Sequence, residues 1–478
     1  MEAQMYVDGH WTGARTGATT VATSPATGEK LGTVPEGDRE DARAAITAAR
    51  RAADGWARLS AFERAALLHR VGDVIESRRD ALARTLTLDQ GKPLRAEAYD
   101  EVDELVVYWR MAAEDAKRLG GMLPHSSSAG KRALLIRRPR GVVGVITPWN
   151  WPYTMPAELI APALAGGNTV VWTPAPSTSM AAVALAACLA DADLPPGVVN
   201  LVTGPGPVVG DEIARHRGTD AVAFSGSTAT GMRVANAAAG KATLLEMGGN
   251  GPLVVLADAD LDRAVDGAIL ACFLCAGQSC TAGERLLVHD AVREEFTARL
   301  VAAVEQRVRL GDPLADDTTM GPLNNATVAA KMDEHVADAV RRGAAVLTGG
   351  ARAGGLPTDL YWQPTVLGEV PADALAATEE TFGPIAPIVG IGSLEEAIRL
   401  TNDSRYGLLA AIYTADLRTG LEFADAVRMG WVNINESTNY WESHLPFGGR
   451  AGTGSGLGRV GGSHPIEAFT ELQTVLIS

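Results

Sequence analysis

The spacing of apolar residues changes along the chain from a helical to a strand pattern. Between Arg39 and Arg118, apolar positions recur three and four residues apart among Ala, Leu, Glu and Arg, which predicts amphipathic helices. Gly120, Gly121 and Pro124 then end this pattern. Residues 121–140 alternate and become apolar, so we expect a strand excursion between the helices and the region that follows.

Five short apolar runs alternate with Ala-rich segments over residues 142–246. Gly or Pro follows each run and a helical stretch comes next, which is typical of βαβ units around a parallel, ligand-binding sheet. The runs are VVGVI at 142–146, TVVW at 169–172, VVNLV at 198–202, AVAFSG at 221–226 and TLLEMGG at 243–249. A second alternation begins after Leu253, with runs such as GERLLVHD and APIVGIG, and predicts a second α/β domain. The chain ends in a Gly-rich loop and an apolar strand, TVLIS, whose exposed edge we expect to join another subunit.

Composition and charge narrow the functional classes. With 478 residues, of which 46% are hydrophobic and 21% charged, the chain has an ordinary globular composition and room for two or three domains. A net charge of -15 argues against nucleic acid as a partner, because a phosphate backbone needs clustered Lys and Arg. We find neither a leader-like amino terminus nor an apolar run that could span a bilayer, so we expect a cytoplasmic protein without a membrane partner.

The four cysteines are too few for a disulfide framework in a chain of this length. Cys272, Cys275 and Cys280 lie close together, but no second Cys-x-x-Cys and no paired His completes a zinc site. We therefore predict no metal. The small residues and the amide that precede Cys280, in FLCAGQSC, instead leave space around its sulfur and indicate a reactive thiol.

Two turns have the composition of phosphate-binding loops. Gly206 and Gly210 belong to a loose GxGxxxG that fits an ordinary strand-to-helix turn equally well. FSGST, at 224–228, is more specific, because Ser227 and free backbone N–H groups at a helix start can face a pyrophosphate. Two such turns on one sheet favour a nicotinamide dinucleotide.

The string F-x-x-x-G-Q-x-C that ends at Cys280 resembles the active-site segment of the aldehyde dehydrogenase superfamily. TPWNWP, LEMGGN, EETFGP and PFGG are similar to further motifs of that family, in the same order. The resemblance implies an NAD(P)-dependent, hydrolytic enzyme in which Cys280 attacks the aldehyde and forms a thiohemiacetal and then a thioester. It implies that Asn150 stabilises the oxyanion and that Glu246 activates the hydrolytic water.

The resemblance also implies the domain organisation and the assembly. We expect a Rossmann-like cofactor-binding domain at 1–120 and 141–246, an α/β catalytic domain at 247–446, and a small β oligomerisation excursion at 121–140 and 447–478. The partner would be a second copy of the chain, in a homodimer or a homotetramer.

The cofactor contacts follow from the same resemblance. Glu380 and Phe382 match the pair that holds the nicotinamide ribose and ring. The other expected cofactor contacts are Ile146, Thr147, Trp149, Thr173, Pro176, Gly206, Gly210, Phe224, Gly226, Ser227 and Met247. Thr173 and Pro176 replace the Lys and Glu of the family's Lys-Pro-x-Glu, which would hold the adenosine ribose, so the choice between NAD and NADP stays open, with NAD as the first expectation.

The substrate pocket is the part of the site that the sequence defines least. By family analogy its lining is expected to include Tyr108, Trp109, Trp151, Met155, Glu158, Ser279, Thr281 and the segment 436–445, which contains Tyr440, Trp441, Glu442 and His444. Aromatic residues suit aromatic or medium aliphatic aldehydes, the acidic residues tolerate an amino group, and the scarcity of Arg disfavours a terminal carboxylate or phosphate.

Two rival functions remain at this point. A CoA-acylating aldehyde dehydrogenase would resemble this chain, but such enzymes generally lack the glutamate base that Glu246 matches. A catalytically silent binding relative would keep the fold, but intact Cys280, Asn150 and Glu246 argue against it.

Overall fold

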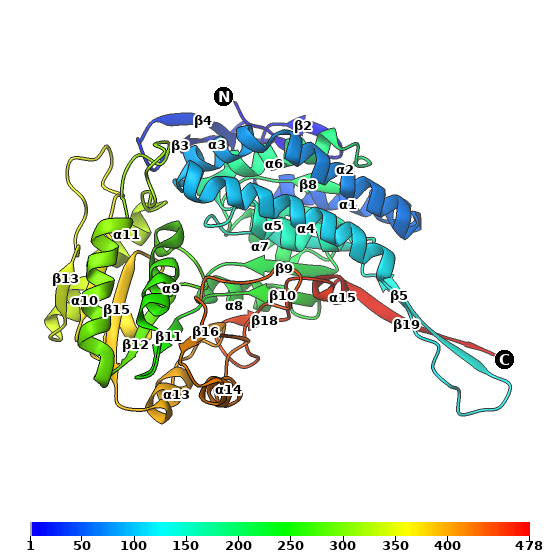
Figure 1. Cartoon of the computed structure of the whole chain (residues 1–478). Coiled ribbons are helices and arrows are strands. Elements are labelled where there is room, and N and C mark those ends of the chain that lie inside the picture. Colours follow the sequence, from blue (N-terminus) through cyan, green and yellow to red (C-terminus); the bar gives the residue numbers. More distant parts are fainter. Residues whose placement is uncertain (1) are drawn as a thin grey trace.

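A computed structural model of residues 2–478 confirms two α/β domains, and the five apolar runs form the parallel centre of the first sheet (Figure 1). In spatial order these strands are β10 (Ala242–Glu246), β9 (Ala221–Ser225), β6 (Val142–Ile146), β7 (Thr169–Thr173) and β8 (Val199–Leu201). Short antiparallel strands extend both edges of this sheet: β18 (Gly456–Leu457) beside β10, and β1 (Met5–Val7) and β2 (His10–Thr12) beyond β8.

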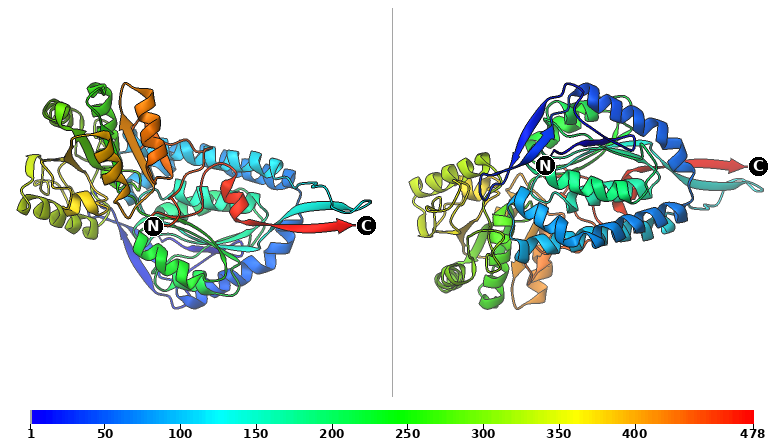
Figure 2. Two further views of the ribbon diagram at one scale, coloured as in Figure 1. Left: turned by 90° about the horizontal axis from the view of Figure 1, so that it is seen from below. Right: turned by 90° about the horizontal axis from the view of Figure 1, so that it is seen from above.

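Helices cover both faces of this sheet, because buried apolar residues alternate between the two sides of each strand (Figure 2). Val142 and Val171 pack with α1 and α7, whereas their neighbours Val143 and Val170 pack with α5 and α6 on the opposite face. The helices of this domain are α1 (Arg39–Arg58), α2 (Ala61–Ser77), α3 (Arg79–Gln90), the π-helix η1 (Leu94–Ala98), α4 (Tyr99–Arg118), α5 (Thr154–Ala165), η2 (Pro176–Thr178), α6 (Ser179–Asp191), α7 (Val209–Arg215) and α8 (Thr228–Ala237).

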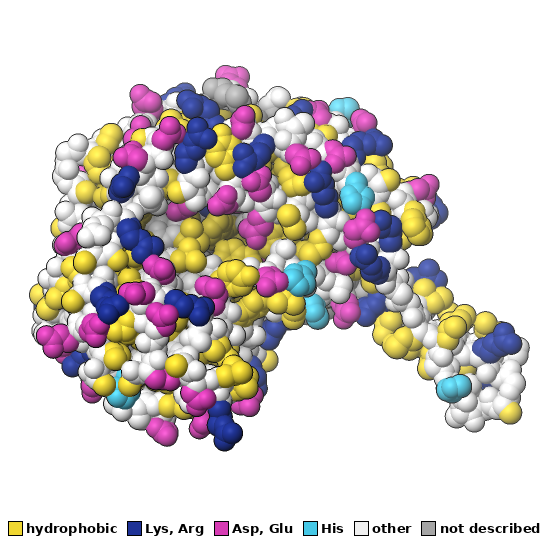
Figure 3. All heavy atoms as spheres, viewed as in Figure 1, with side chains coloured by type: hydrophobic (Ala, Val, Ile, Leu, Met, Phe, Trp, Pro, Cys, Tyr) yellow, Lys and Arg dark blue, Asp and Glu magenta, His cyan; other side chains and the backbone are white. Residues whose placement is uncertain are grey.

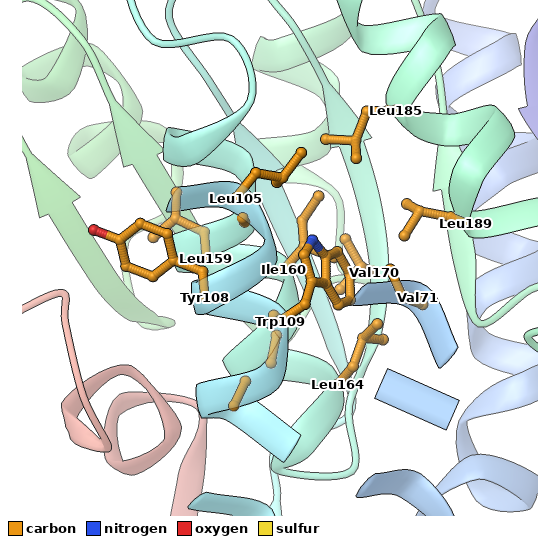
Figure 4. Close-up of a cluster of buried hydrophobic side chains, with 14 of the residues drawn as sticks. Val71, Leu105, Tyr108, Trp109, Leu159, Ile160, Leu164, Val170, Leu185 and Leu189 are labelled. Carbon is orange, nitrogen blue, oxygen red and sulfur yellow. The ribbon is translucent and has the colours of Figure 1, made fainter. Parts of the chain in front are cut away.

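The predicted helical stretch at 39–118 divides into several helices at capping residues. The Asp38 and Ser60 side chains accept hydrogen bonds from backbone N–H groups at the starts of α1 and α2, each in a reciprocal capping box. Helix α4 packs on α2 and α5, and its Trp109 points into the core between them (Figure 4). The prediction that Trp109 lines the substrate pocket is therefore wrong, because helical periodicity turns it inward while Tyr108, one position earlier, points to the other side.

The second domain contains a seven-stranded sheet that is parallel except at one edge. In spatial order its strands are β13 (Ala345–Thr348), β14 (Thr365–Gly368), β15 (Ile385–Ile391), β12 (Gly283–His289), β11 (Gly251–Val255), β16 (Leu409–Tyr413) and β17 (Trp431–Ile434). Its helices are α9 (Leu261–Phe273), η3 (Leu274–Gly277), α10 (Asp290–Arg307), α11 (Ala326–Arg341), α12 (Leu375–Thr378), α13 (Leu394–Asn402) and α14 (Leu417–Ala426).

A two-stranded antiparallel ribbon projects from the body of the molecule (Figures 1 and 3). It pairs β5 (Arg132–Pro139) with β19 (Thr470–Ile477), which follows α15 (His464–Ala468). The segment 447–478 was expected to serve oligomerisation. Its last strand, β19, lies in this ribbon, whereas β18 joins the first sheet. A hairpin near the amino terminus consists of β3 (Thr19–Thr23) and β4 (Lys30–Pro35). No helix of residues 2–478 is long and apolar enough to cross a membrane.

Candidate active site

Two cavities meet at Cys280, which lines both of them. The wider cavity has a volume of about 540 Å³ and extends from Cys280 past Ser227 to α11. The narrower cavity has a free volume of only about 20 Å³ and lies between α4, α5 and the loop that contains Trp441. Cys280 therefore separates a space large enough for a cofactor from a narrow space for a substrate.

A left-handed turn between α9 and Cys280 places the thiol at this junction. Cys275, Ala276 and Gly277 all have positive φ, at 52°, 52° and 69°. A Cβ atom at Gly277 would lie 2.2 Å from the Gly383 carbonyl oxygen, so only glycine fits there. The buried Glu97 carboxylate accepts the Cys275 N–H at 3.0 Å and holds the turn.

Glu246 lies beside the thiol at the carboxyl end of β10. Parallel pairing sets Glu246 opposite Ser225 on β9, and the Ser225 hydroxyl donates to Glu246 Oε2 at 2.8 Å. Burial raises the pKa of Glu246 to about 7, although hydrogen bonds from Ser225 and Cys280 oppose this shift. Burial, with the Glu246 charge adding to it, raises the pKa of the Cys280 thiol well above its ordinary value. The resting thiol therefore keeps its proton, and Glu246 is the adjacent base that can accept it.

Asn150 lies in the loop after β6 and is held by the cysteine loop itself. Its Nδ2 donates to the Gln278 carbonyl oxygen at 3.0 Å. Gln278 is fixed in turn, because its Nε2 donates to the Cys275 carbonyl at 2.8 Å and its Oε1 accepts the Asn324 N–H at 2.9 Å. One amide hydrogen of Asn150 is thus engaged, and the other is available to an oxyanion that forms on a carbonyl bound at Cys280.

The wall of the wider cavity fits a nicotinamide ribonucleotide. The rings of Trp149 and Phe382 meet edge to face, with centroids 5.5 Å apart, and give the cavity a flat apolar side. Glu380 accepts the Gly249 N–H at 2.9 Å, which orients its carboxylate toward a ribose. A Cβ atom at Gly248 would lie 2.6 Å from that carboxylate, so glycine is required at this position. The nicotinamide, when bound, supplies the hydride acceptor.

The amino-terminal end of α8 opens into the same cavity. Ser227 caps this ten-residue helix, and Gly226, with φ at 153°, lets the chain turn into it. N–H groups at such a helix end suit a pyrophosphate. Phe224 and Met247 do not line the cavity; both are buried beneath α8, where a Cβ atom at Gly231 would collide with them.

The other expected cofactor residues lie outside the lining of the wider cavity: Ile146, Thr147, Thr173 and Pro176 end or follow β6 and β7, Gly206 follows β8, and Gly210 lies in α7. A Cβ atom at Gly210 would lie 3.6 Å from Ile146 and 3.7 Å from Thr173, so these three residues adjoin. Thr147 Oγ1 accepts the Trp172 indole N–H at 2.8 Å. Pro176 is exposed, and the space around Gly206 is open.

Helix α11 also contributes to the site, which the sequence did not predict. Thr327, Val328, Ala330, Lys331 and Glu334 line the wider cavity opposite the first domain. An amphipathic helix far along the chain from Cys280 has no sequence pattern that assigns it to a site. The charge of Lys331 on a cavity wall is a feature that only the fold reveals.

Seven of the predicted pocket residues line the narrower cavity: Tyr108, Trp151, Met155, Glu158, Ser279, Thr281 and Trp441. Tyr440 does not, because its side chain is exposed, and its neighbour Trp441 takes that place. Glu104, Thr154 and Phe447 also line the cavity and were missed. Glu104 precedes Tyr108 by one helical turn on α4, so i, i+4 spacing could have found it.

The cysteines outside the site are free thiols in the core. Cys188, Cys272 and Cys275 are buried, and Cys272 Sγ donates to the Gly283 carbonyl oxygen at 3.2 Å. Across residues 2–478, no group of three or more His, Cys, Asp or Glu side chains is arranged to hold a metal ion.

Comparison with known proteins places this site in a large family. Residues 11–475 match the aldehyde dehydrogenase family. An NADP-dependent succinate-semialdehyde dehydrogenase of Escherichia coli is 40% identical over 99% of this chain and 97% of its own length. The crystal structure of an NADP-dependent Escherichia coli enzyme superimposes with a TM-score of 0.96 at 39% identity, covering 100% of this chain and 98% of that one. A betaine aldehyde dehydrogenase of Staphylococcus aureus in complex with NAD+ also gives a TM-score of 0.96, at 33% identity over 99% of this chain and 94% of that one.

Proposed function

The chain belongs to the aldehyde dehydrogenase family and oxidises an aldehyde to its carboxylic acid with NAD(P), and we propose that Cys280, Glu246 and Asn150 carry out this reaction. The observation that supports the assignment best is the meeting of the two cavities at Cys280, with the Glu246 carboxyl beside its thiol. A substrate carbonyl that enters by the narrow cavity would meet the sulfur at the end of the wide one.

The proposed reaction follows from these contacts. Glu246 accepts the thiol proton while the Cys280 sulfur attacks the carbonyl carbon, and a thiohemiacetal forms. The Asn150 side-chain amide and the Cys280 backbone N–H donate to its oxyanion. Loss of hydride from the former carbonyl carbon, which a bound nicotinamide would accept, leaves a thioester. After Glu246 has released its first proton, it takes a second one from water, which attacks the thioester, and the carbon–sulfur bond breaks to give the acid and the free thiol.

The direct test of this function is the absorbance of reduced nicotinamide with a panel of aldehydes, measured with and without CoA. We expect turnover without CoA and the free acid as product, because Glu246 provides for hydrolysis. A strict requirement for CoA, with an acyl-CoA product, would contradict the hydrolytic assignment.

We propose that selectivity between NAD and NADP is weak in this chain. Thr173 is buried and Pro176 exposed at the end of β7, and neither side chain has a charge that could hold or repel an adenosine ribose substituent. Each missing charge-assisted hydrogen bond is worth about 1.5–3 kcal/mol.

Introducing Thr173→Lys together with Pro176→Glu should tighten NAD binding and penalise NADP. We expect the ratio of kcat/KM for NAD over NADP to rise about tenfold or more, because a carboxylate at position 176 repels a 2′-phosphate. The measurement is this ratio in the parent and the double variant, with Ser177→Glu, at the exposed neighbouring position, as the matched control. A parent strict for NAD, or an unchanged ratio in the double variant, would place the selectivity elsewhere.

We propose that the projecting ribbon formed by β5 and β19 joins two copies of the chain. Leu472, Leu476 and Ile477 on β19 and Met122 and Leu123 near β5 are exposed large apolar residues (Figure 3). Leu472→Glu would place an unpaired charge in that contact and is expected to weaken self-association by about tenfold or more. Analytical ultracentrifugation measures this effect, with Gln473→Glu on the opposite face of the strand as control. A monomeric parent, or equal masses for Leu472→Glu and the parent, would contradict the proposal.

We also propose that the protein works in the cytoplasm. All four of its cysteines are free thiols, and the catalytic one must stay reduced to react.

A further inference from the structure

Carboxyl groups are the charged groups that line the narrower cavity. Among the described residues of its wall, Glu104 and Glu158 are acidic, and none is Lys, Arg or His. Glu104 reaches the cavity from α4 and Glu158 from α5, so the two carboxyls come from different elements and converge on one space.

Glu158 has an oxygen that the protein leaves without a partner. Its Oε1 accepts the Tyr108 hydroxyl, whereas no donor among residues 2–478 bonds its Oε2, although the side chain is 6% exposed and lines the cavity. Glu104 Oε1 accepts the Trp441 indole N–H at 2.9 Å and the Tyr108 hydroxyl at 3.4 Å. A buried acceptor without a donor is costly, so a ligand that donates or carries positive charge would relieve it.

The pKa values of Glu104 and Glu158 are consistent with a site for a cation. Burial raises the pKa of Glu104 to about 7 and that of Glu158 well above its ordinary value. Near neutral pH, Glu104 is therefore partly protonated, although the Lys92 charge acts to lower its pKa. A bound cation would favour the ionised forms of both carboxyls and would gain their full attraction.

Aromatic rings complete the wall around these carboxyls. Trp151 and Trp441 meet edge to face, with centroids 5.9 Å apart, and Tyr108 lines the same cavity. The Lys92 ammonium already stacks 3.7 Å from the centre of the Trp151 ring, where its charge is balanced by the buried Glu101. Aromatic faces and carboxylates together are the surroundings that recognise ammonium groups.

We propose that the preferred substrate is an aldehyde with an ammonium group at the end remote from its carbonyl, bound by Glu104 and Glu158 among these rings. The rings must move apart to admit this group, because the free volume between them is only about 20 Å³. This inference rests on the proposed function, because it places the carbonyl at Cys280. A carboxylate at the same end of the substrate would find no Lys, Arg or His among the described residues of the cavity wall, and its charge would repel Glu104 and Glu158 in their ionised forms.

The test compares aldehydes of one length and different charge. The probes are 4-trimethylammoniobutanal, its uncharged isostere 5,5-dimethylhexanal, and the anion of succinate semialdehyde. We expect kcat/KM for the cation to exceed that for the isostere by about tenfold or more and the anion to be the poorest substrate. Equal efficiencies for cation and isostere, or a preference for the anion, would overturn the inference.

Variants that remove a charge test whether Glu104 and Glu158 cause the preference for the cationic aldehyde. Glu158→Gln and Glu104→Gln keep the size of each side chain and remove its charge, so each should lower the ratio of cation to isostere efficiency by about tenfold. Glu442→Gln changes an exposed acid outside the cavity wall and should leave the ratio unchanged. If one variant fails to fold, the other and the parent ratio still decide the question. An unchanged ratio in the folded variants would overturn the inference, whereas a parent that oxidises none of the three aldehydes would contradict the proposed function itself.

Discussion

Cys280→Ser is expected to abolish aldehyde oxidation and to leave dinucleotide binding intact. A serine hydroxyl at this position cannot ionise as a thiol does, and its alkoxide would be a far less accessible nucleophile beside Glu246. We expect kcat to fall by about a thousandfold or more, as it does when a catalytic unit loses its nucleophile. Reduced-nicotinamide absorbance measures the loss, and a binding titration with NAD and NADP measures what is retained.

Cys272→Ser is the matched control for this substitution. Cys272 is buried near the site and donates to a carbonyl oxygen that a serine hydroxyl can also reach, so activity should persist. Turnover by Cys280→Ser close to that of the parent would refute covalent catalysis by this residue.

Glu246→Gln is expected to slow steady-state turnover by about a hundredfold to ten-thousandfold, the usual contribution of a general base. Hydride leaves before the water attacks, so the variant should still release up to one equivalent of reduced cofactor per site in the first turnover. Because Glu246 is also the base beside the high-pKa thiol, that first turnover should be slower than in the parent. Stopped-flow absorbance separates the two phases.

Turnover by the parent enzyme should also depend on pH, in the direction that the pKa of Glu246 sets. The pKa of Glu246 is raised to about 7, so the carboxyl is protonated and inactive as a base below that pH and ionised above it. Parent turnover should therefore rise through pH 7 and then level off, and Glu246→Gln should lose this rise. Multiple fast turnovers by the variant would show that another group serves as the base.

The two sheets could be predicted to different degrees from the sequence. The central strands of the first sheet are buried on both faces and read as continuous apolar runs, so their positions were found nearly to the residue. The edge strands β1, β2 and β18 have two or three residues each, too few for a pattern to repeat.

The candidate site could likewise be predicted only in part from the sequence. The motifs around Cys280, Glu246 and Asn150 identified these residues, and the fold brings all three to the wall of one cavity. Sequence could not assign α11 to that wall, because its contribution depends on how the second domain packs against the first. Trp441 rather than Tyr440 enters the narrow cavity because loop geometry, not spacing, sets which neighbour points inward.

The most direct test of covalent catalysis by Cys280 is mass spectrometry of Glu246→Gln. The variant is mixed with aldehyde and NAD(P) and quenched after one turnover. We expect the protein to gain the mass of one acyl group, with the added mass on the peptide containing Cys280. Reduced cofactor formed with no acyl group on that peptide, or with the acyl group on another residue, would contradict covalent catalysis by Cys280.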